Sequence, residues 1–369
     1  MVKINKIHNM SLKKVVTKNR SIWQRNILSW YTLNKRKLPW RKKKYQNFYC
    51  IWLSEIMLQQ TGVKVVKPYF IKFLKKWPNF KTFSKASLEE ILFYWQGLGY
   101  YQRARNMFKA IDIIKNKKNL KSYEDFIGIP GVGDYTASSI SAILYDSSKA
   151  VIDGNIKRIL SRVVNLNPEE KSFIKNLNFI AQYLTPKKSN GIYCQALMDL
   201  GSLICKPKNP LCIKCPVNDC CDYYNSPKKR FTKNIIKNKK RKLGVAFYLN
   251  YKNLIYLEKS TNNFLHGLMK FPCSDFIDIN NIYNSDYSHL EQKLILNFKK
   301  KTKLEYDKYE FYYIKHTFSD FYLKLLVVKI ELKSKDNIKL NGIWMNKKQI
   351  SSLPFSKLME KVRIGFDKR

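Results

Sequence analysis

YEDFIGIPGVGDYTASSIS, residues 123–141, contains two runs with helical spacing joined by a turn rich in glycine. The turn is Gly128-Ile-Pro-Gly131-Val-Gly133, and the flanking runs are Tyr123–Ile127 and Tyr135–Leu144. Because glycine allows close backbone approach, amides of the turn can face an anion at the start of the second helix, where the helix dipole favours negative charge. The stretch therefore predicts a helix pair that anchors a phosphate backbone without reading base sequence.

Helical spacing continues on both sides of this turn, and strand patterns dominate the last third of the chain. Further helices are expected at Ile22–Leu33, Tyr49–Gln60, Val65–Lys76, Leu88–Trp95, Arg103–Asn116 and Ile156–Val164. Beyond Gly244 the period changes toward two, which predicts a hairpin turning at Asn250–Asn253, strands at Tyr309–Ile314 and Phe321–Leu332, and a helix at Ser288–Phe298. The predicted chain is a mainly α module joined to a smaller α+β module.

The charge of the chain is extreme. Its 369 residues include 70 Lys and Arg against 27 Asp and Glu, a formal net charge of +43. Such a field favours a polyanionic partner, nucleic acid first, although a coding bias toward Lys, Asn, Ile, Tyr and Phe would explain part of the excess. No apolar run reaches the roughly 18 residues of a membrane span. Residues 226–242 are basic and lack acids, which predicts a linker lying along phosphates or acting as a solvated tether.

Four cysteines, Cys205, Cys212, Cys215 and Cys221, follow the spacing C-x6-C-x2-C-x5-C within one short loop. Four thiolates gathered in this way suit either a tetrahedral zinc ion or an iron–sulfur cluster. A chain of this length can build its core without disulfides, and it carries no secretory signal, so a metal site in a reducing compartment is favoured over disulfide pairing. Cys220 is an alternative fourth ligand.

One acid is isolated among cations. Glu55 is the only acidic residue of the first 88, which contain 21 Lys and Arg. On a helix its neighbours one turn away include Ile51, Trp52 and Leu58, so its carboxyl projects from a mostly apolar face. Burial there would raise its pKa and keep it protonated, as a general acid requires, whereas an ion pair with a nearby Arg or Lys is the alternative.

Several further motifs follow one another along the chain. They are Leu38-Pro-Trp-Arg41, Trp52-Leu-Ser-Glu-Ile-Met-Leu-Gln-Gln-Thr61, Gly97-Leu-Gly-Tyr-Tyr101, Val151-Ile-Asp-Gly-Asn155 and Ala196-Leu-Met-Asp-Leu-Gly201. With the glycine turn and the four-cysteine loop, they closely resemble the MutY family of adenine DNA glycosylases in the helix-hairpin-helix superfamily. The resemblance covers about residues 22–225 strongly and the remainder more weakly. It implies a mainly α helix-hairpin-helix glycosylase fold whose Cys205, Cys212, Cys215 and Cys221 hold a [4Fe–4S] cluster.

The resemblance also assigns catalytic roles. Cleavage of an N-glycosidic bond needs a proton on the leaving base and negative charge near an oxocarbenium-like sugar, which two carboxyl groups in different environments provide. Glu55 is expected to protonate adenine, and Asp153 to stabilise or capture the cation, although an ordinary helix N-cap is the simpler role for Asp153. Tyr135 stands where bifunctional relatives carry a Schiff-base lysine. Its hydroxyl is expected to assist at the sugar or at Asp153, and packing on the hairpin is the alternative.

Base extrusion requires groups that fill the vacated space and hold the orphan partner. The resemblance places Gln60, Thr61, Leu98 and Tyr100 in the duplex around 8-oxoguanine, and Leu38, Trp40, Arg41 and Asp199 in the adenine pocket. The expected substrate and DNA contacts in full are Leu38, Trp40, Arg41, Leu58, Gln60, Thr61, Leu98, Tyr100, Gly131, Gly133, Asn155, Asp199, Phe318 and Ser319.

The C-terminal part resembles the α+β Nudix-like domain with which this family inspects the lesion. The matching segments are Phe264–Pro272, Lys315–Asp320 and Leu353–Leu358, and no Nudix hydrolase box is present. The lesion-reading loop of the family is Phe-Ser-His, whereas this chain has Phe318-Ser319-Asp320. An acid beside DNA adds repulsion, which leaves the strength of lesion discrimination open, and Ser319 can still offer its hydroxyl.

Four segments are therefore expected: a flexible basic arm (1–20), a glycosylase domain (21–225), a basic linker (226–242) and a Nudix-like domain (243–369). The expected enzyme is a monofunctional adenine DNA glycosylase, a monomer acting on double-stranded DNA that contains A opposite 8-oxoguanine or G. It is expected in a bacterial cytoplasm with the nucleoid and away from membranes. Two rivals remain: an endonuclease III-like lyase on oxidised pyrimidines, and a cluster-bearing DNA-binding protein without enzymatic activity.

Overall fold

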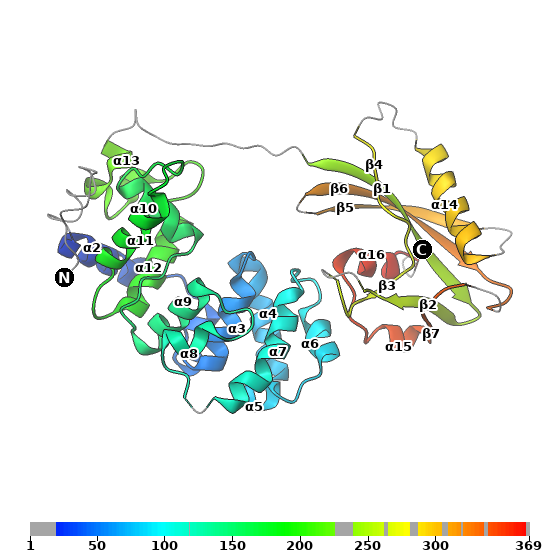
Figure 1. The fold of residues 1–369 in the computed structure, drawn as a ribbon, viewed down its shortest axis with the longest axis horizontal. Coiled ribbons are helices and arrows are strands. Elements are labelled where there is room, and N and C mark those ends of the chain that lie inside the picture. The colour runs from blue at the N-terminus through cyan, green and yellow to red at the C-terminus, as the bar shows by residue number, and fades with distance from the viewer. Residues whose placement is uncertain are drawn as a thin grey trace. The chain divides into compact units, whose positions relative to one another are not determined.

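The computed structural model describes residues 20–117, 119–225, 239–261, 265–280, 287–304, 309–318, 320–335 and 339–366. The expected basic arm lies outside them, except for its last residue. The described chain forms two compact units (Figure 1). The first takes the described residues of 20–84 and 109–225, and the second those of 85–108 and 239–366, so residues 85–108 group with the C-terminal part and not with the helical domain assigned from sequence. No described helix is long and apolar enough to cross a membrane.

The first unit is helical, and local capping signals start many of its helices. The Asn47 side chain accepts the Cys50 N–H at the start of one helix, and Ser122 and Asp125 form a capping box at another. The helices are α2 (Arg20–Asn34), α3 (Phe48–Leu58), α4 (Val63–Lys76), α5 (Phe80–Phe83), α8 (Tyr123–Ile127), α9 (Asp134–Tyr145), α10 (Gly154–Val163), α11 (Phe173–Leu184), α12 (Asn190–Leu203) and α13 (Asp222–Asn225), with 3-10 turns at Pro39–Arg41, Lys43–Tyr45, Cys212–Lys214 and Asn218–Cys220.

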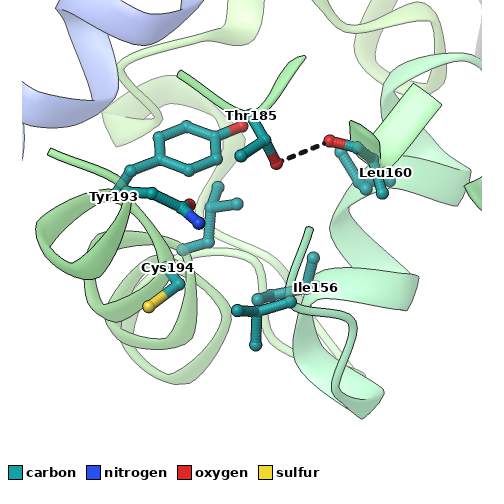
Figure 2. Close-up of a pocket in the computed structure, with 9 residues that line it drawn as sticks. Ile156, Leu160, Thr185, Tyr193 and Cys194 are labelled. Carbon is teal, nitrogen blue, oxygen red and sulfur yellow. Dashed lines mark hydrogen bonds between the residues drawn. The ribbon is translucent and has the colours of Figure 1, made fainter. Parts of the chain in front are cut away.

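One buried cluster joins α2 to α10, α11 and α12. It includes Trp23, Leu160, Ile180 and Leu197, each no more than 2% exposed. A gap too small to hold a water molecule remains inside it, lined by residues that include Ile156, Leu160, Thr185, Tyr193 and Cys194 (Figure 2). Most polar side chains around the gap have partners within the protein: the Trp23 indole donates to the Tyr193 hydroxyl at 2.8 Å, and the Thr185 hydroxyl donates to the Ala181 carbonyl at 2.8 Å, whereas Asn190 Oδ1 has no partner among the described residues. We interpret this gap as a packing space of the core.

The second unit contains a mixed sheet with the strand order β3-β2-β1-β6-β5, to which β4 and β7 add at β1 and β2. Only the β1–β6 pair is parallel, and it runs over eleven positions from Lys240↔Phe321 to Asn250↔Glu331. The strands are β1 (Lys240–Tyr251), β2 (Leu254–Lys259), β3 (Met269–Lys270), β4 (Ile277–Asp278), β5 (Tyr309–Thr317), β6 (Phe321–Glu331) and β7 (Ile343–Asn346).

Helices cover both faces of this sheet. From α14 (Ser288–Thr302), Ile295 and Phe298 pack on one face, and the Phe298 ring stacks on Phe247 at 3.6 Å. Side chains of α15 (Lys347–Ile350) and α16 (Lys357–Gly365), among them Ile350 and Val362, pack on the other face. The predicted α+β class and the hairpin at Asn250–Asn253 are confirmed.

The expected linker is shorter than predicted at its C-terminal end. Residues 226–238 lie outside the described residues, but Lys240–Lys242 already belong to β1 and pair with Phe321–Leu323 of β6. A parallel partner about 80 residues away leaves no local signal, so the basic composition of these residues predicted a linker.

Two helices preceding this sheet in the chain, α6 (Leu88–Trp95) and α7 (Gln102–Asn116), frame the Gly97–Tyr101 segment. Within the second unit, the Tyr101 hydroxyl donates to the Phe355 carbonyl at 3.2 Å, and the Phe355 N–H donates to the Gln96 side chain at 3.3 Å. These bonds explain why the segment groups with the sheet.

Candidate active site and cysteine loop

The predicted helix–turn–helix is present. Helices α8 and α9 flank a turn in which Gly131 has φ of 81°, a conformation that favours glycine, and Gly133 is the N-cap of α9. A methyl group added at Gly128 or Gly133 would meet no protein atom within 4 Å. The surface above the start of α9 is therefore open to the close approach of a phosphate.

Glu55 is buried on α3, as predicted, with only 4% of its surface exposed. Burial first, and nearby Asp153 to a smaller extent, raise the pKa of its carboxyl, which all contributions together bring to about 7. The hydroxyl groups of Ser139 and Tyr135, and then the charge of Arg41, act in the opposite direction. Its Oε2 atom has no hydrogen-bond partner among the described residues. A carboxyl with this pKa can carry a proton at neutral pH.

Tyr135 and Asp153 lie close to this carboxyl. Burial first, and then the charges of Glu55 and Asp153, raise the pKa of the Tyr135 phenol well above its usual value, so the phenol keeps its proton. Asp153 is the N-cap of α10: one oxygen accepts the Ile156 N–H at 2.6 Å, and the other accepts the Asn155 side-chain amide at 2.9 Å. The capping role of Asp153 is thus real, and it places a carboxylate beside Glu55 with both oxygens oriented.

A small pocket of about 40 cubic ångströms opens beside Glu55. Leu38, Trp40 and Arg41 line it from the 3-10 turn, and Leu58 lines it from α3, as the sequence comparison with the family anticipated. The Nε atom of Arg41 is buried there without a hydrogen-bond partner among the described residues, like Oε2 of Glu55. Both residues line the pocket, so a polar ligand that reached these two atoms would supply the hydrogen bonds they lack.

Asp199 takes a different position from the one expected. Its side chain is fully buried on α12, and its two oxygens accept four hydrogen bonds, two from Arg36 and two from Arg41. Asp199 does not line the pocket, whereas both of its arginine partners do. The carboxylate therefore supports the pocket wall, and no capacity is left for a direct bond to a base.

Asn155 links Asp153, through Arg158, to the cysteine loop. Its side-chain oxygen accepts from Arg158 at 2.8 Å, and Arg158 also donates to the Cys205 carbonyl at 2.9 Å. One turn later, Arg162 donates to the Cys205 sulfur at 3.3 Å and to the Lys206 carbonyl at 2.7 Å. Helix α10 thus carries Asp153 at its start and binds the cysteine loop along its length.

The cysteine loop gathers its thiols around one cavity. All eight cysteines of the chain are free. Cys205, Cys212, Cys215 and Cys221 line a cavity of about 30 cubic ångströms, and Cys220 does not. No three metal-binding side chains of the described residues stand close enough to hold a single ion. The four cysteines that the sequence predicts as metal ligands are the ones that line this cavity.

Of the residues expected to insert into a DNA duplex, some are exposed and others are buried. Tyr100 is 53% exposed with φ of 47°, and Gln60 has φ of 55° at the end of α3 next to the partly buried Thr61. Leu98 is only 5% exposed, so its insertion into DNA would require a movement of the loop. Sequence patterns do not show this, because glycines flank Leu98 as they would flank an exposed tip.

The expected lesion loop is only partly visible. Phe318 stacks on Phe321 at 4.5 Å and packs against the sheet core, and Asp320 is exposed. Ser319 lies outside the described residues.

Several residues of this site were not anticipated. Ser139 faces Glu55 from α9, Arg36 shares Asp199 with Arg41, and Gln195 and Met198 line the pocket from α12. The Gln59 amide bonds the Gly131 carbonyl and the Thr136 hydroxyl, each at 3.1 Å, and so ties α3 to the hairpin. In the sequence, only the one-turn spacing of Gln195 and Met198 on a helix could have indicated that these two side chains share a face.

Comparison with known proteins agrees with this geometry. Residues 53–182 match the profile of the HhH-GPD superfamily of base excision DNA repair proteins. The adenine DNA glycosylase of Buchnera aphidicola from Schizaphis graminum is 35% identical over 361 residues, 92% of this chain and 97% of that protein. The rat adenine DNA glycosylase is 38% identical over 213 residues, 54% of this chain and 41% of that protein. A thermostable thymine-DNA glycosylase structure superposes with a TM-score of 0.51 at 27% identity, covering 57% of this chain and 99% of that one.

The hairpin, the buried acid with its neighbouring aspartate and these matches define a base excision DNA N-glycosylase with a helix-hairpin-helix fold. It is a DNA-binding enzyme. Since its nearly full-length relative exceeds 30% identity, the chain belongs to the adenine DNA glycosylase family.

Proposed function

We propose that this protein is a monofunctional glycosylase that extrudes adenine paired with 8-oxoguanine, or with G, and hydrolyses its N-glycosidic bond in base excision repair. The observation that carries the proposal is the pocket lined by Glu55 and Arg41, each of which has one buried polar atom (Oε2 and Nε) without a hydrogen-bond partner among the described residues. An extruded purine has ring nitrogens that can form hydrogen bonds with these groups and planar faces that can pack against the apolar side chains of the pocket.

The residues divide the chemistry between them. Protonated Glu55 donates its proton to the departing base, so that adenine leaves as a neutral molecule. The Asp153 carboxylate, oriented by the Ile156 N–H and the Asn155 amide, supplies negative charge to the oxocarbenium-like sugar or bonds to it. Glu55 returns to its protonated form when water replaces the base at the sugar and gives up a proton. Tyr135, which keeps its proton, orients the two carboxyl groups.

The absence of a lyase step rests on Tyr135. A phenol forms no Schiff base with the abasic sugar, and none of the described residues that line the pocket is a lysine. This argument favours the hydrolytic enzyme over an endonuclease III-like lyase.

An end-labelled duplex with A opposite 8-oxoguanine tests the proposal. We expect strand breaks only after alkaline treatment, because the product is an intact abasic strand. Breaks without alkali would indicate a lyase, and no breaks under either condition would indicate a DNA-binding protein without this activity. Glu55→Gln and Asp153→Asn should each abolish the alkali-sensitive product, and full activity of either variant would overturn the catalytic assignment.

We further propose that Cys205, Cys212, Cys215 and Cys221 hold a [4Fe–4S] cluster. The proposal is supported by the four thiols, which line one cavity. When bound, the cluster would cross-link the loop and present Lys206 and Lys208 to DNA. Replacing each cysteine singly by serine should lower iron content and visible absorbance in these four variants, whereas Cys220→Ser should retain both. Iron loss in Cys220→Ser but not in Cys221→Ser would reverse the assignment.

The family and the site also support a monomer that acts on duplex DNA in the cytoplasm of a bacterium, close to the nucleoid. The proposed lesion recognition belongs to the second unit, where Phe318 and Asp320 stand at the turn between β5 and β6. The Nudix-like character of that unit remains a prediction from sequence. Gel filtration with and without an A:8-oxoguanine duplex tests the monomer, and a dimer peak would overturn it.

A further inference from the structure

Asp199 is a buried carboxylate that neither lines the pocket nor cleaves a bond, yet it organises two pocket residues. Its Oδ1 accepts from Arg36 Nε at 2.7 Å and from Arg41 Nη2 at 2.9 Å. Its Oδ2 accepts from the Arg36 backbone N–H at 2.9 Å and from Arg41 Nη1 at 2.7 Å. Arg36 is fixed in turn by its bond to the Ser202 hydroxyl at 3.1 Å.

This arrangement engages both terminal nitrogens of Arg41 with Asp199, a carboxylate that does not line the pocket. Arg41 and Glu55 line the same pocket, and only the Nε atom of Arg41 lacks a partner there. Without Asp199, a buried guanidinium would have lost its counter-charge, and Glu55 would be the nearest carboxyl on the pocket wall that could replace it. An Arg41–Glu55 ion pair would remove the proton that catalysis requires.

We propose that Asp199, seated by Arg36, is a positioning residue that keeps the charge of Arg41 away from Glu55 and so preserves the acid in its protonated form. This inference rests on the proposed role of Glu55 and deepens it. The other titratable groups that face Glu55 are Tyr135 from α9, Asp153 from α10 and Cys194 from α12. None of these makes a bond to Asp199, so its removal acts through the two arginines.

The pH profile of adenine release under single-turnover conditions tests the inference. For the wild type, release should decline as the pH rises through the pKa of Glu55, about 7. In Asp199→Asn the freed Arg41 lowers the pKa of Glu55, so this decline should begin about one pH unit lower. Ser202→Ala, which removes only the outer bond of Arg36, is the matched control and should leave the profile in place.

A double-variant comparison separates a positioning role from two simpler ones. If Asp199 acts through Arg41, Asp199→Asn should shift the profile in the wild-type background and not in an Arg41→Met background. An equal shift in both backgrounds would mean that the charge of Asp199 acts on Glu55 directly, and no shift in either would mean that Asp199 is merely structural. Each of these results overturns the inference.

Two further readouts keep the test independent of folding and of the proposed function. Asp199→Asn leaves the cations Arg36 and Arg41 with less negative charge beside them. The double variant Asp199→Asn/Arg36→Met removes one of these cations and retains Arg41, so it should fold more readily and show the same shift of the pH profile. An unshifted profile in this folded variant would overturn the inference. If the wild type releases no adenine, the proposed function fails, whereas normal wild-type release with an unshifted variant rejects only the role of Asp199.

Discussion

At the scale of single residues, Glu55 combines its proposed role as the general acid with a cost in stability. Its pKa is raised from 4.5 to about 7 by burial, so folding favours the protonated carboxyl. The stabilising contribution of the neutral form is complete below the unfolded pKa and is lost as the pH rises through the folded value. At pH 8 the folded protein must hold a charge in an apolar site, which costs up to about 3 kcal/mol.

Glu55→Gln should therefore inactivate and stabilise the protein together. We expect adenine release to fall by about 10²- to 10⁴-fold, the usual contribution of a general acid. Thermal unfolding at pH 8 should show a higher Tm than the wild type, and the difference should shrink as the pH approaches 5. A variant less stable than the wild type at pH 8 would contradict a buried, charge-penalised Glu55.

Ser139 also affects the pKa of Glu55, and its effect is smaller than that of burial. Its hydroxyl lowers the pKa of Glu55, so Ser139→Ala should raise that pKa and move the alkaline decline of adenine release to higher pH. Ser138→Ala is the matched control, because that hydroxyl is buried to the same degree and does not act on Glu55. A shift in the control as large as in Ser139→Ala would show that repacking of α9, and not the hydroxyl, is responsible.

At the scale of secondary-structure elements, the hairpin was predictable because its signals are local. Glycines, a proline and the Ser122 cap lie within about 20 residues of one another, and each acts on its immediate neighbours. The role of Asp199 was not predictable, since its partners lie about 160 residues earlier in the chain. The parallel β1–β6 pair and the burial of Leu98 depend equally on distant contacts, which periodicity does not record.

The hairpin makes a prediction that separates binding from folding. Gly133→Ala should leave the Tm unchanged, because its φ of −87° is open to alanine and the added methyl would touch no protein atom. The methyl would instead occupy the approach of a phosphate, and the Kd for duplex DNA should rise several-fold.

Gly131→Ala provides the contrast. Its φ of 81° is unfavourable for alanine, so this variant should lose about 1 kcal/mol of stability, measured by denaturant unfolding. Unchanged DNA affinity in Gly133→Ala would show that the hairpin does not meet the backbone at this position.

At the scale of the whole molecule, the charge of +43 has two explanations that predict different behaviour. If the excess lysines are a consequence of coding bias alone, they are scattered, and few of them meet phosphates. If they form the DNA-binding field of the enzyme, many phosphates are neutralised at once, and counterion release makes binding strongly dependent on salt. The described lysines are compatible with both interpretations, because they occur on the cysteine loop and also along helices such as α4 and α14.

Salt dependence decides between these explanations. For a field that neutralises six to ten phosphates, the Kd for an undamaged duplex should rise about 10³- to 10⁵-fold between 50 and 200 mM salt. The Kd for an A:8-oxoguanine duplex should rise in parallel, because phosphate contacts carry no sequence information and the preference for the lesion comes from the pocket and the second unit. Fluorescence anisotropy with both duplexes measures the two slopes. A rise in Kd of less than tenfold would assign most of the excess lysine to coding bias. If the Kd for the lesion duplex depended much less on salt than the Kd for the undamaged duplex, uncharged contacts to the extruded base and its partner would replace the phosphate contacts on recognition.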